Sequence, residues 1–138
     1  MNVFVDTNIL LDVLMYRKEH LVESATVWDC AERGKINSYV SAISFNNIHY
    51  LFRRNLGAVK AKQAVVTLRD TFNIVPLDGK IIDQAIDADW NDFEDAIQFF
   101  SAIRCDAECI VTRNQKDFKD SSIPAMSPKD LLALLKLS

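Results

Sequence analysis

Short apolar runs alternate with segments of helical periodicity along nearly the whole chain, and this alternation limits the folds that the sequence can adopt. The first run, residues 3–5, is followed by Asp6, Thr7 and Asn8, whose side chains are suited to capping a helix. Apolar side chains then recur at helical spacing through residues 9–14. This order predicts a strand that is followed directly by a helix.

The same alternation continues toward the C-terminus. We expect further strands at residues 38–41, 73–76, 108–112 and 125–126. We expect further helices at residues 19–33, 44–52, 59–71, 80–88, 93–104 and 129–137, of which the second and third form a hairpin. Caps of these helices are expected at Gly34, Ser44, Asp92 and Ser127.

Strands that alternate with helices form parallel sheets with right-handed crossovers and helices on both faces. We therefore expect an α/β fold, a three-layer α/β/α sandwich around a central parallel sheet of four to five strands. The 138 residues contain no repeat and no linker, so we expect a single domain over residues 1–138. In such sheets, ligands bind outside the carboxyl ends of the strands, where the strand order reverses. Polar residues that follow the strands are thus the candidates for a functional site.

The composition excludes several classes of protein. Its 16 basic and 19 acidic side chains give a net charge of −3, so any nucleic-acid site must be a local patch. The three cysteines, Cys30, Cys105 and Cys109, match neither a zinc pattern nor a disulfide scaffold, which favours a reducing cytoplasm. Neither Cys105 nor Cys109 has a histidine nearby in the sequence to activate it, so we expect both to be packing residues. No uncharged apolar run approaches the roughly 18 residues of a membrane span.

Oxygen-bearing side chains stand at the positions where the fold would place a ligand site. Asp6 follows the first strand, Asp92 and Asp95 open a late helix, and Asn114 and Asp117 follow the strand at 108–112. Hard cations such as Mg²⁺ or Mn²⁺ prefer oxygen ligands, and a Mg²⁺ site usually combines one or two carboxylates with waters and a substrate phosphate. A bound metal would activate water for hydrolysis of a phosphodiester. The pattern therefore indicates a metal-dependent nuclease.

Each of these residues also has a purely structural interpretation. Asp6 is well placed to cap the first helix, and Asp92 and Asp95 have the spacing of a capping box. Asn114 suits an Asx turn, and Asp117 suits a solvated loop.

Basic residues cluster in two places. Arg53 and Arg54 lie on the predicted helical hairpin, and Arg113 and Lys116 lie beside the acidic residues. An RNA backbone is a candidate ligand for both groups, although solvated helix faces explain the same pattern.

Three segments together resemble the PIN-domain family over nearly the whole chain. They are Val-Asp-Thr-Asn-Ile-Leu-Leu-Asp at residues 5–12, Asp-Phe-Glu-Asp-Ala at 92–96, and Val-Thr-Arg-Asn at 111–114 followed by Asp117. The resemblance implies a PIN-like sandwich and an RNase that uses Mg²⁺ or Mn²⁺. It also implies a toxin of the VapBC type, with an antitoxin protein as partner and a homodimer as a common assembly.

The resemblance assigns roles residue by residue. Asp6 corresponds to the first acidic ligand of the family, and Asp95 to the ligand at the start of the late helix. Asn47 and Asn114 stand where the family usually has Glu and Asp, and each amide offers an oxygen without a charge. We therefore expect Asp6, Asp95, Asn47 and Asn114 in the catalytic centre. The expected metal ligands are Asp6, Asp95, Asp92 and Asp117.

Two other functions remain open at this point. The amides at Asn47 and Asn114 are also consistent with a catalytically weak PIN fold that binds RNA or a protein partner. An aspartyl phosphatase with Asp6 as nucleophile is less favoured, because that class places a second Asp two residues later, where this chain has Asn8. A nucleotide-binding enzyme is disfavoured because the chain lacks a glycine-rich phosphate loop.

Overall fold

The computed structural model describes residues 1–136, and Leu137 of the last predicted helix lies outside them. The strands are β1 (Asn2–Val5), β2 (Asn37–Ser41), β3 (Asn73–Val75), β4 (Cys109–Val111) and β5 (Ala125–Met126). The helices are α1 (Thr7–Leu14), α2 (Leu21–Glu32), α3 (Ala42–Leu56), α4 (Ala58–Thr71), α5 (Gly79–Ala88), α6 (Phe93–Arg104) and α7 (Pro128–Lys136), with a 3₁₀ turn η1 (Gln115–Phe118). None of the helices within residues 1–136 has the length and apolar character to cross a membrane.

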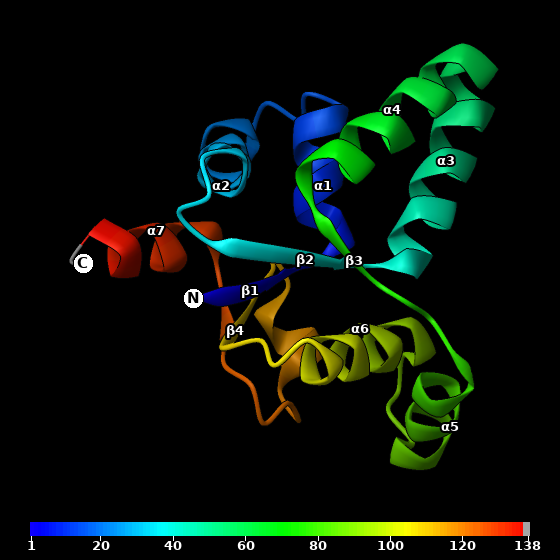
Figure 1. The fold of residues 1–138 in the computed structure, drawn as a ribbon, viewed down its shortest axis with the longest axis vertical. Helices are drawn as coiled ribbons and strands as arrows, with labels where there is room; N and C mark the ends of the chain where they lie inside the picture. The colour runs from blue at the N-terminus through cyan, green and yellow to red at the C-terminus, as the bar shows by residue number, and fades with distance from the viewer. Residues whose placement is uncertain (137–138) are drawn as a thin grey trace.

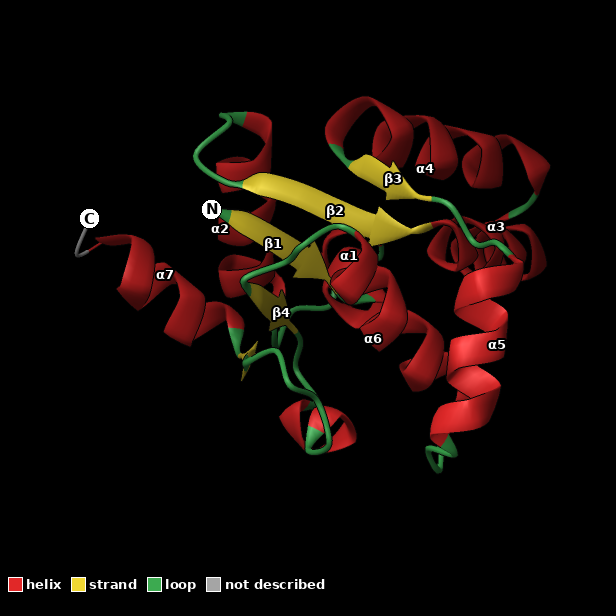
Figure 2. Cartoon of the chain, turned by 60° about the horizontal axis from the view of Figure 1, so that its bottom comes forward, coloured by secondary structure: helices red, strands yellow, loops and turns green. Residues whose placement is uncertain are grey.

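The five strands form one parallel sheet in the order β3-β2-β1-β4-β5, which confirms the predicted α/β fold (Figure 2). From β1 the chain adds strands on one side, through β2 to β3, and then returns to place β4 on the other side of β1. The strand order therefore reverses between β1 and β4. Ligands of such sheets bind outside the strand ends at this position.

The alternating side chains of the central strands divide the core into two layers. Val3 and Val5 pack with the helices α1, α2, α3, α4 and α7 on one face of the sheet. Phe4 and Ile110 pack with α5 and α6 on the opposite face. Figure 1 shows the two sets of helices on either side of the strands. The observed architecture is the three-layer sandwich that the sequence predicts.

Two local features differ from the sequence-based expectation. The predicted cap Ser44 lies inside α3 and is fully buried, while Ser41 caps that helix by accepting a hydrogen bond from the Ile43 amide at 3.2 Å. Ser41 ends β2 in extended conformation, so the helix starts directly where the strand stops. The turn η1 was not expected, because its four residues are too few to show a helical period.

Candidate functional site

Asp6 stands at the centre of the candidate site, between the end of β1 and the start of α1. Its backbone N–H continues the sheet by donating to the Val111 carbonyl at 3.0 Å. One carboxylate oxygen caps α1 by accepting from the Thr7 amide at 2.8 Å, and the other accepts from the Thr112 hydroxyl at 2.8 Å. These bonds fix the carboxylate at the reversal point of the sheet, with only 7% of the residue exposed.

Burial raises the pKa of Asp6 from 3.8 to about 6, against the hydrogen bonds from Thr112 and Thr7, which lower it. The charges of Glu94 and Asp117 raise it further. The capping role proposed for Asp6 is therefore real, yet the carboxylate also lies among other acidic groups. A helix cap in water would not acquire such a pKa.

Thr112, the first residue after β4, organises the opposite side of the site. Its buried hydroxyl donates to Asp6 and accepts from the Asn114 amide at 3.0 Å. The Asn8 side-chain amide lies 3.4 Å from the same hydroxyl. The ends of the two central strands are thus joined by hydrogen bonds, which hold the β1 and β4 loops in one arrangement.

The N-terminus of α6 brings in the next carboxylates. Asp92 caps the helix by accepting from the Asp95 amide at 2.9 Å, half of the reciprocal capping box that the spacing suggested. Burial raises the pKa of Asp95 from 3.8 to about 7, and the charges of Asp92, Asp117, Asp6 and Glu94 add to the effect. Asp95 is therefore surrounded by like charges.

α3 contributes Asn47, whose side-chain amide donates to the Glu94 carboxylate at 2.9 Å. This bond lowers the pKa of Glu94, whereas partial burial and the charge of Asp92 raise it, and the net direction is upward. The amide at position 47 thus supplies a donor to a neighbouring carboxylate. A carboxylate at this position would repel Glu94 instead.

Asp6, Asn47, Glu94 and Asp95 line one open hollow of about 410 Å³ at the carboxyl ends of β1 and β4, which we call the acidic hollow. Of the ten residues predicted to form the site, five line it: Asp6, Asn47, Asp95, Asn114 and Asp117. Asp92 and Lys116 line an adjoining hollow of about 380 Å³, which Asp95 and Asp117 also border. Arg53 and Arg54 are exposed on α3 and border neither hollow. Arg113 lines a different depression, described below.

The donor set fits a hydrated divalent cation better than a closed metal cage. Among residues 1–136, no three carboxylate, histidine or cysteine side chains are placed to ligate a single ion together. Mg²⁺ is commonly held by one or two carboxylates, with water completing its shell. Asp6 and Asp95 are two carboxylates that could hold such a cation, and burial, with a further contribution from neighbouring carboxylates, raises the pKa of both.

A buried polar network behind the hollow was not predicted. The Gln98 amide of α6 donates to the Thr7 hydroxyl at 2.9 Å, and Thr7 and Ser44 share a hydroxyl hydrogen bond of 2.7 Å. The network ties α6, α1 and α3 together directly beneath the carboxylates. A glutamine three residues after Asp95, on the apolar side of a helix, was the available signal in the sequence.

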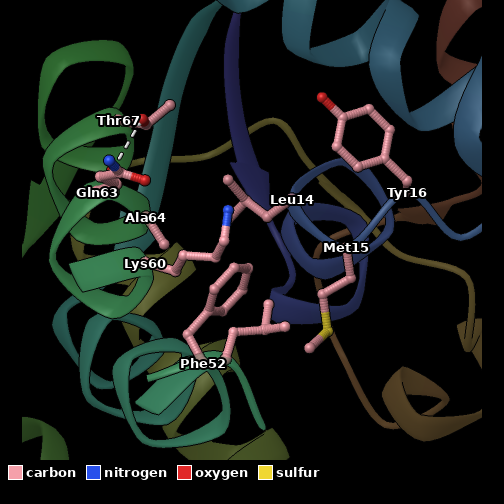
Figure 3. Close-up of a pocket in the computed structure, with 9 residues that line it drawn as sticks. Leu14, Met15, Tyr16, Phe52, Lys60, Gln63, Ala64 and Thr67 are labelled. Carbon is pink, nitrogen blue, oxygen red and sulfur yellow. Dashed lines mark hydrogen bonds between the residues drawn. The ribbon is translucent and has the colours of Figure 1, made fainter. Parts of the chain in front are cut away.

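An apolar groove of about 350 Å³ lies between the end of α1 and the α3–α4 hairpin (Figure 3). Figure 3 shows Leu14 and Met15 on one side and Phe52, Lys60 and Ala64 on the other. Tyr16 and Leu56 also line the groove, with 76% and 51% of their surface exposed. The groove therefore presents apolar surface to solvent.

A family model described as PIN domain matches residues 2–116. Among solved structures, VapBC2 from Rickettsia felis, bound to a DNA fragment from its promoter, superposes with a TM-score of 0.71 at 15% identity, covering 92% of this chain and 98% of that chain. A toxin–antitoxin complex from Klebsiella pneumoniae superposes with a TM-score of 0.66 at 22% identity, covering 91% of this chain and 97% of that chain. VapC20 from Mycobacterium tuberculosis is a toxin that cleaves the sarcin–ricin loop. It superposes with a TM-score of 0.64 at 15% identity, covering 78% of this chain and 86% of that chain. At these identities the likeness shows a common fold. No curated protein matches the sequence.

Proposed function

We propose that this chain, which belongs to the PIN domain family, is a metal-dependent endoribonuclease that acts as a single domain. The observation that carries the proposal is the convergence of Asp6 and Asp95 at the point where the strand order reverses. Both carboxyl groups have raised pKa values, and within residues 1–136 neither forms an ion pair with a basic side chain. A site that accumulates negative charge in this way is suited to a divalent cation and, through it, to a phosphate.

Asp6 and Asp95 would hold Mg²⁺ or Mn²⁺, with Asp117 at the edge of the same hollow. A cation bound there lowers the pKa of a bound water and stabilises the charge that develops on the phosphate. The Thr112 and Thr7 hydrogen bonds orient the Asp6 carboxylate before any ligand arrives. Glu94, with its raised pKa and its bond from Asn47, is placed to accept a proton near the same hollow.

We further propose that the protein is the toxin of a toxin–antitoxin pair, as in the similar complexes from Rickettsia felis and Klebsiella pneumoniae. The free thiols of Cys30, Cys105 and Cys109 fit a reducing cytoplasm, where such pairs act.

The test is cleavage of a panel of single-stranded and structured RNAs, including a sarcin–ricin loop hairpin, by the purified protein. We expect cleavage with Mn²⁺ or Mg²⁺ and none with EDTA. Asp6→Asn and Asp95→Asn should each reduce the rate by at least roughly 10–100-fold, because each removes a charge that fixes the metal. Asp106→Asn, a matched change on the loop before β4, should leave the rate unchanged. Cleavage that persists in EDTA, or in both site variants, would refute the proposal.

A second candidate, a binding module without turnover, is favoured by the two amides and by the lack of three converging metal-binding side chains within residues 1–136. Asn47→Asp distinguishes the two functions. In a ribonuclease, the new carboxylate strengthens Mn²⁺ binding, and less Mn²⁺ is needed for half-maximal cleavage. In a binding module, RNA or the partner binds equally well to the wild type and to Asn47→Asp, and neither protein cleaves.

A further inference from the structure

A fully buried carboxylate, Asp12 of α1, lies outside the metal site and is surrounded by cations. It accepts a hydrogen bond from the Ser24 hydroxyl at 3.0 Å and another from the Arg113 Nε at 2.7 Å. The Arg17 guanidinium lies 3.7 Å from its other oxygen. One buried negative charge thus holds two arginines, and this arrangement retains a net positive charge.

The turn after α1 explains why Arg17 lies beside Asp12. Tyr16 adopts a left-handed conformation with φ 51°, and the Arg17 amide donates back to the Asp12 carbonyl at 3.0 Å. The Tyr16 amide donates to Val13 at 3.3 Å, which completes the double hydrogen bond of a Schellman turn. The turn reverses the chain and returns Arg17 to the end of the helix that carries Asp12.

The two arginines border a hollow of about 380 Å³ together with Lys18, Glu19 and His20, and we call these five residues the basic hollow. Arg113 uses its Nε for Asp12, and within residues 1–136 its two Nη groups make no hydrogen bond. Lys18 is exposed and likewise has no ion-pair or hydrogen-bond partner in the described part of the chain. The basic hollow therefore presents unused donors to solvent.

The start of α2 adds to this positive surface. His20 is the N-cap residue of this twelve-residue helix, and its side chain makes no capping hydrogen bond. The amides of a first helical turn carry partial positive charge and favour an anion when no side chain satisfies them. Among residues 1–136, Glu19 is the one acidic side chain that lines the hollow, and its carboxylate lies 3.9 Å from the His20 imidazole.

The basic hollow is joined to the metal site through two consecutive residues. Thr112 donates to Asp6 at 2.8 Å, and Arg113 is the next residue in the chain. The Arg113 backbone amide also donates to the side-chain oxygen of Asn8, Oδ1, at 3.4 Å. Asn8 in turn lines the acidic hollow. A nucleic-acid strand that enters the acidic hollow would thus reach the basic hollow within the next nucleotides.

We propose that the basic hollow binds a backbone phosphate of the RNA strand whose scissile bond lies in the acidic hollow. Arg17, Lys18 and Arg113 contact the phosphate, and Asp12 is a positioning residue that orients the two guanidinium groups. This inference rests on the proposed ribonuclease function and adds a substrate-binding site to it. The ion pairs with Asp12 hold the arginines in place before the strand binds, which reduces the entropy lost on binding.

The test measures binding of a short fluorescent single-stranded oligoribonucleotide in EDTA, so that binding is observed without cleavage. Wild type is compared with Lys18→Gln and with Arg17→Gln/Lys18→Gln over a range of salt concentrations. Each lost phosphate contact should reduce the slope of log Kobs against log salt by about 0.7, and the affinity near 0.1 M salt roughly 5-fold. Lys18→Gln leaves both ion pairs of Asp12 intact, so its effect does not depend on the stability of the fold.

The matched control is Arg33→Gln/Lys35→Gln, which removes the same residue types near the opposite end of α2. It should retain the slope and affinity of the wild type. Equal slopes for wild type, control and both hollow variants, including absence of binding by all, would overturn the inference. Failure of the proposed function is seen separately, as absence of metal-dependent cleavage, whatever the binding slopes are.

Discussion

Replacement of Asp6 by asparagine should reduce metal-dependent cleavage by at least roughly 10–100-fold and at the same time stabilise the metal-free protein at alkaline pH. The pKa of Asp6 rises from 3.8 to about 6, mainly through burial. At about 1.4 kcal/mol per pKa unit, the ionised carboxylate lowers the free energy of unfolding by about 3 kcal/mol. Asparagine can still cap α1 through its carbonyl oxygen, and the effect of the Thr112 hydrogen bond on the charged form is already contained in the pKa shift. We expect Asp6→Asn to gain about 2–3 kcal/mol at about pH 8.

The sign of the pH dependence follows from the raised pKa. Between pH 3.8 and about 6 the folded wild type binds more protons at Asp6 than the unfolded chain does, so its stability falls as pH rises through this range. Above about pH 6 the destabilisation is fully present, and below pH 3.8 it is absent. The gain of Asp6→Asn over wild type should therefore disappear near pH 4.

Urea unfolding of both proteins in EDTA, at about pH 8 and about pH 4, measures the difference. Adding Mn²⁺ at the alkaline pH should stabilise wild type but not Asp6→Asn, because only the wild type retains the ligand. Thr26→Val, a change on the exposed side of α2, serves as a control that should show no pH-dependent difference from wild type. If Asp6→Asn is less stable than wild type by the same amount at both pH values, the reasoning about burial and repulsion is wrong.

Three other predictions concern residues outside the acidic hollow. Arg113→Leu leaves the buried Asp12 carboxylate without its closest cation and should lower the free energy of unfolding by about 3 kcal/mol. Urea unfolding that shows a decrease below ~1 kcal/mol would contradict this prediction. The free energy of unfolding of Gln98→Met should stay within about 1 kcal/mol of the wild-type value, because the buried amide oxygen of Gln98 has no partner among residues 1–136. A loss above ~2 kcal/mol in urea unfolding would show that the hydrogen bonds donated by the Gln98 amide dominate. Burial raises the pKa of Cys105 and Cys109 to about 11, so iodoacetamide near neutral pH should label both thiols slowly in the folded protein and rapidly in urea. Mass spectrometry measures the labelling, and rapid labelling of the folded protein would contradict this prediction.

The fold was predictable because its local signals agree with one another. The run at residues 3–5 is β1, and the capping residue Asp6 stands directly between it and α1, as the sequence indicates. Gly34 has a positive φ of 70° after α2, as its predicted capping position requires. That Asp6 and Asn114 line one hollow followed from the same pattern, because residues after β1 and β4 must meet at one edge of a parallel sheet.

The remaining features depend on contacts between distant segments, which local patterns do not encode. Ser44 has the chemistry of a cap, but its hydroxyl bonds to Thr7 across 37 positions of sequence. The Asp12–Arg113 pair joins residues 101 positions apart, so neither residue indicated the other. Arg53 and Arg54 form a basic pair that the sequence singles out, yet the fold places it away from the carboxylates because it lies on the exposed side of α3.

We propose that Asp6 and Asp95 hold the metal with which the protein cleaves RNA. The most direct measurement is the anomalous diffraction of Mn²⁺ in crystals of the protein. We expect a peak in the acidic hollow, within ligand distance of both the Asp6 and Asp95 carboxylates, and we expect its loss in Asp95→Asn. Absence of Mn²⁺ from the hollow at saturating concentration, or a peak that contacts neither carboxylate, would contradict it.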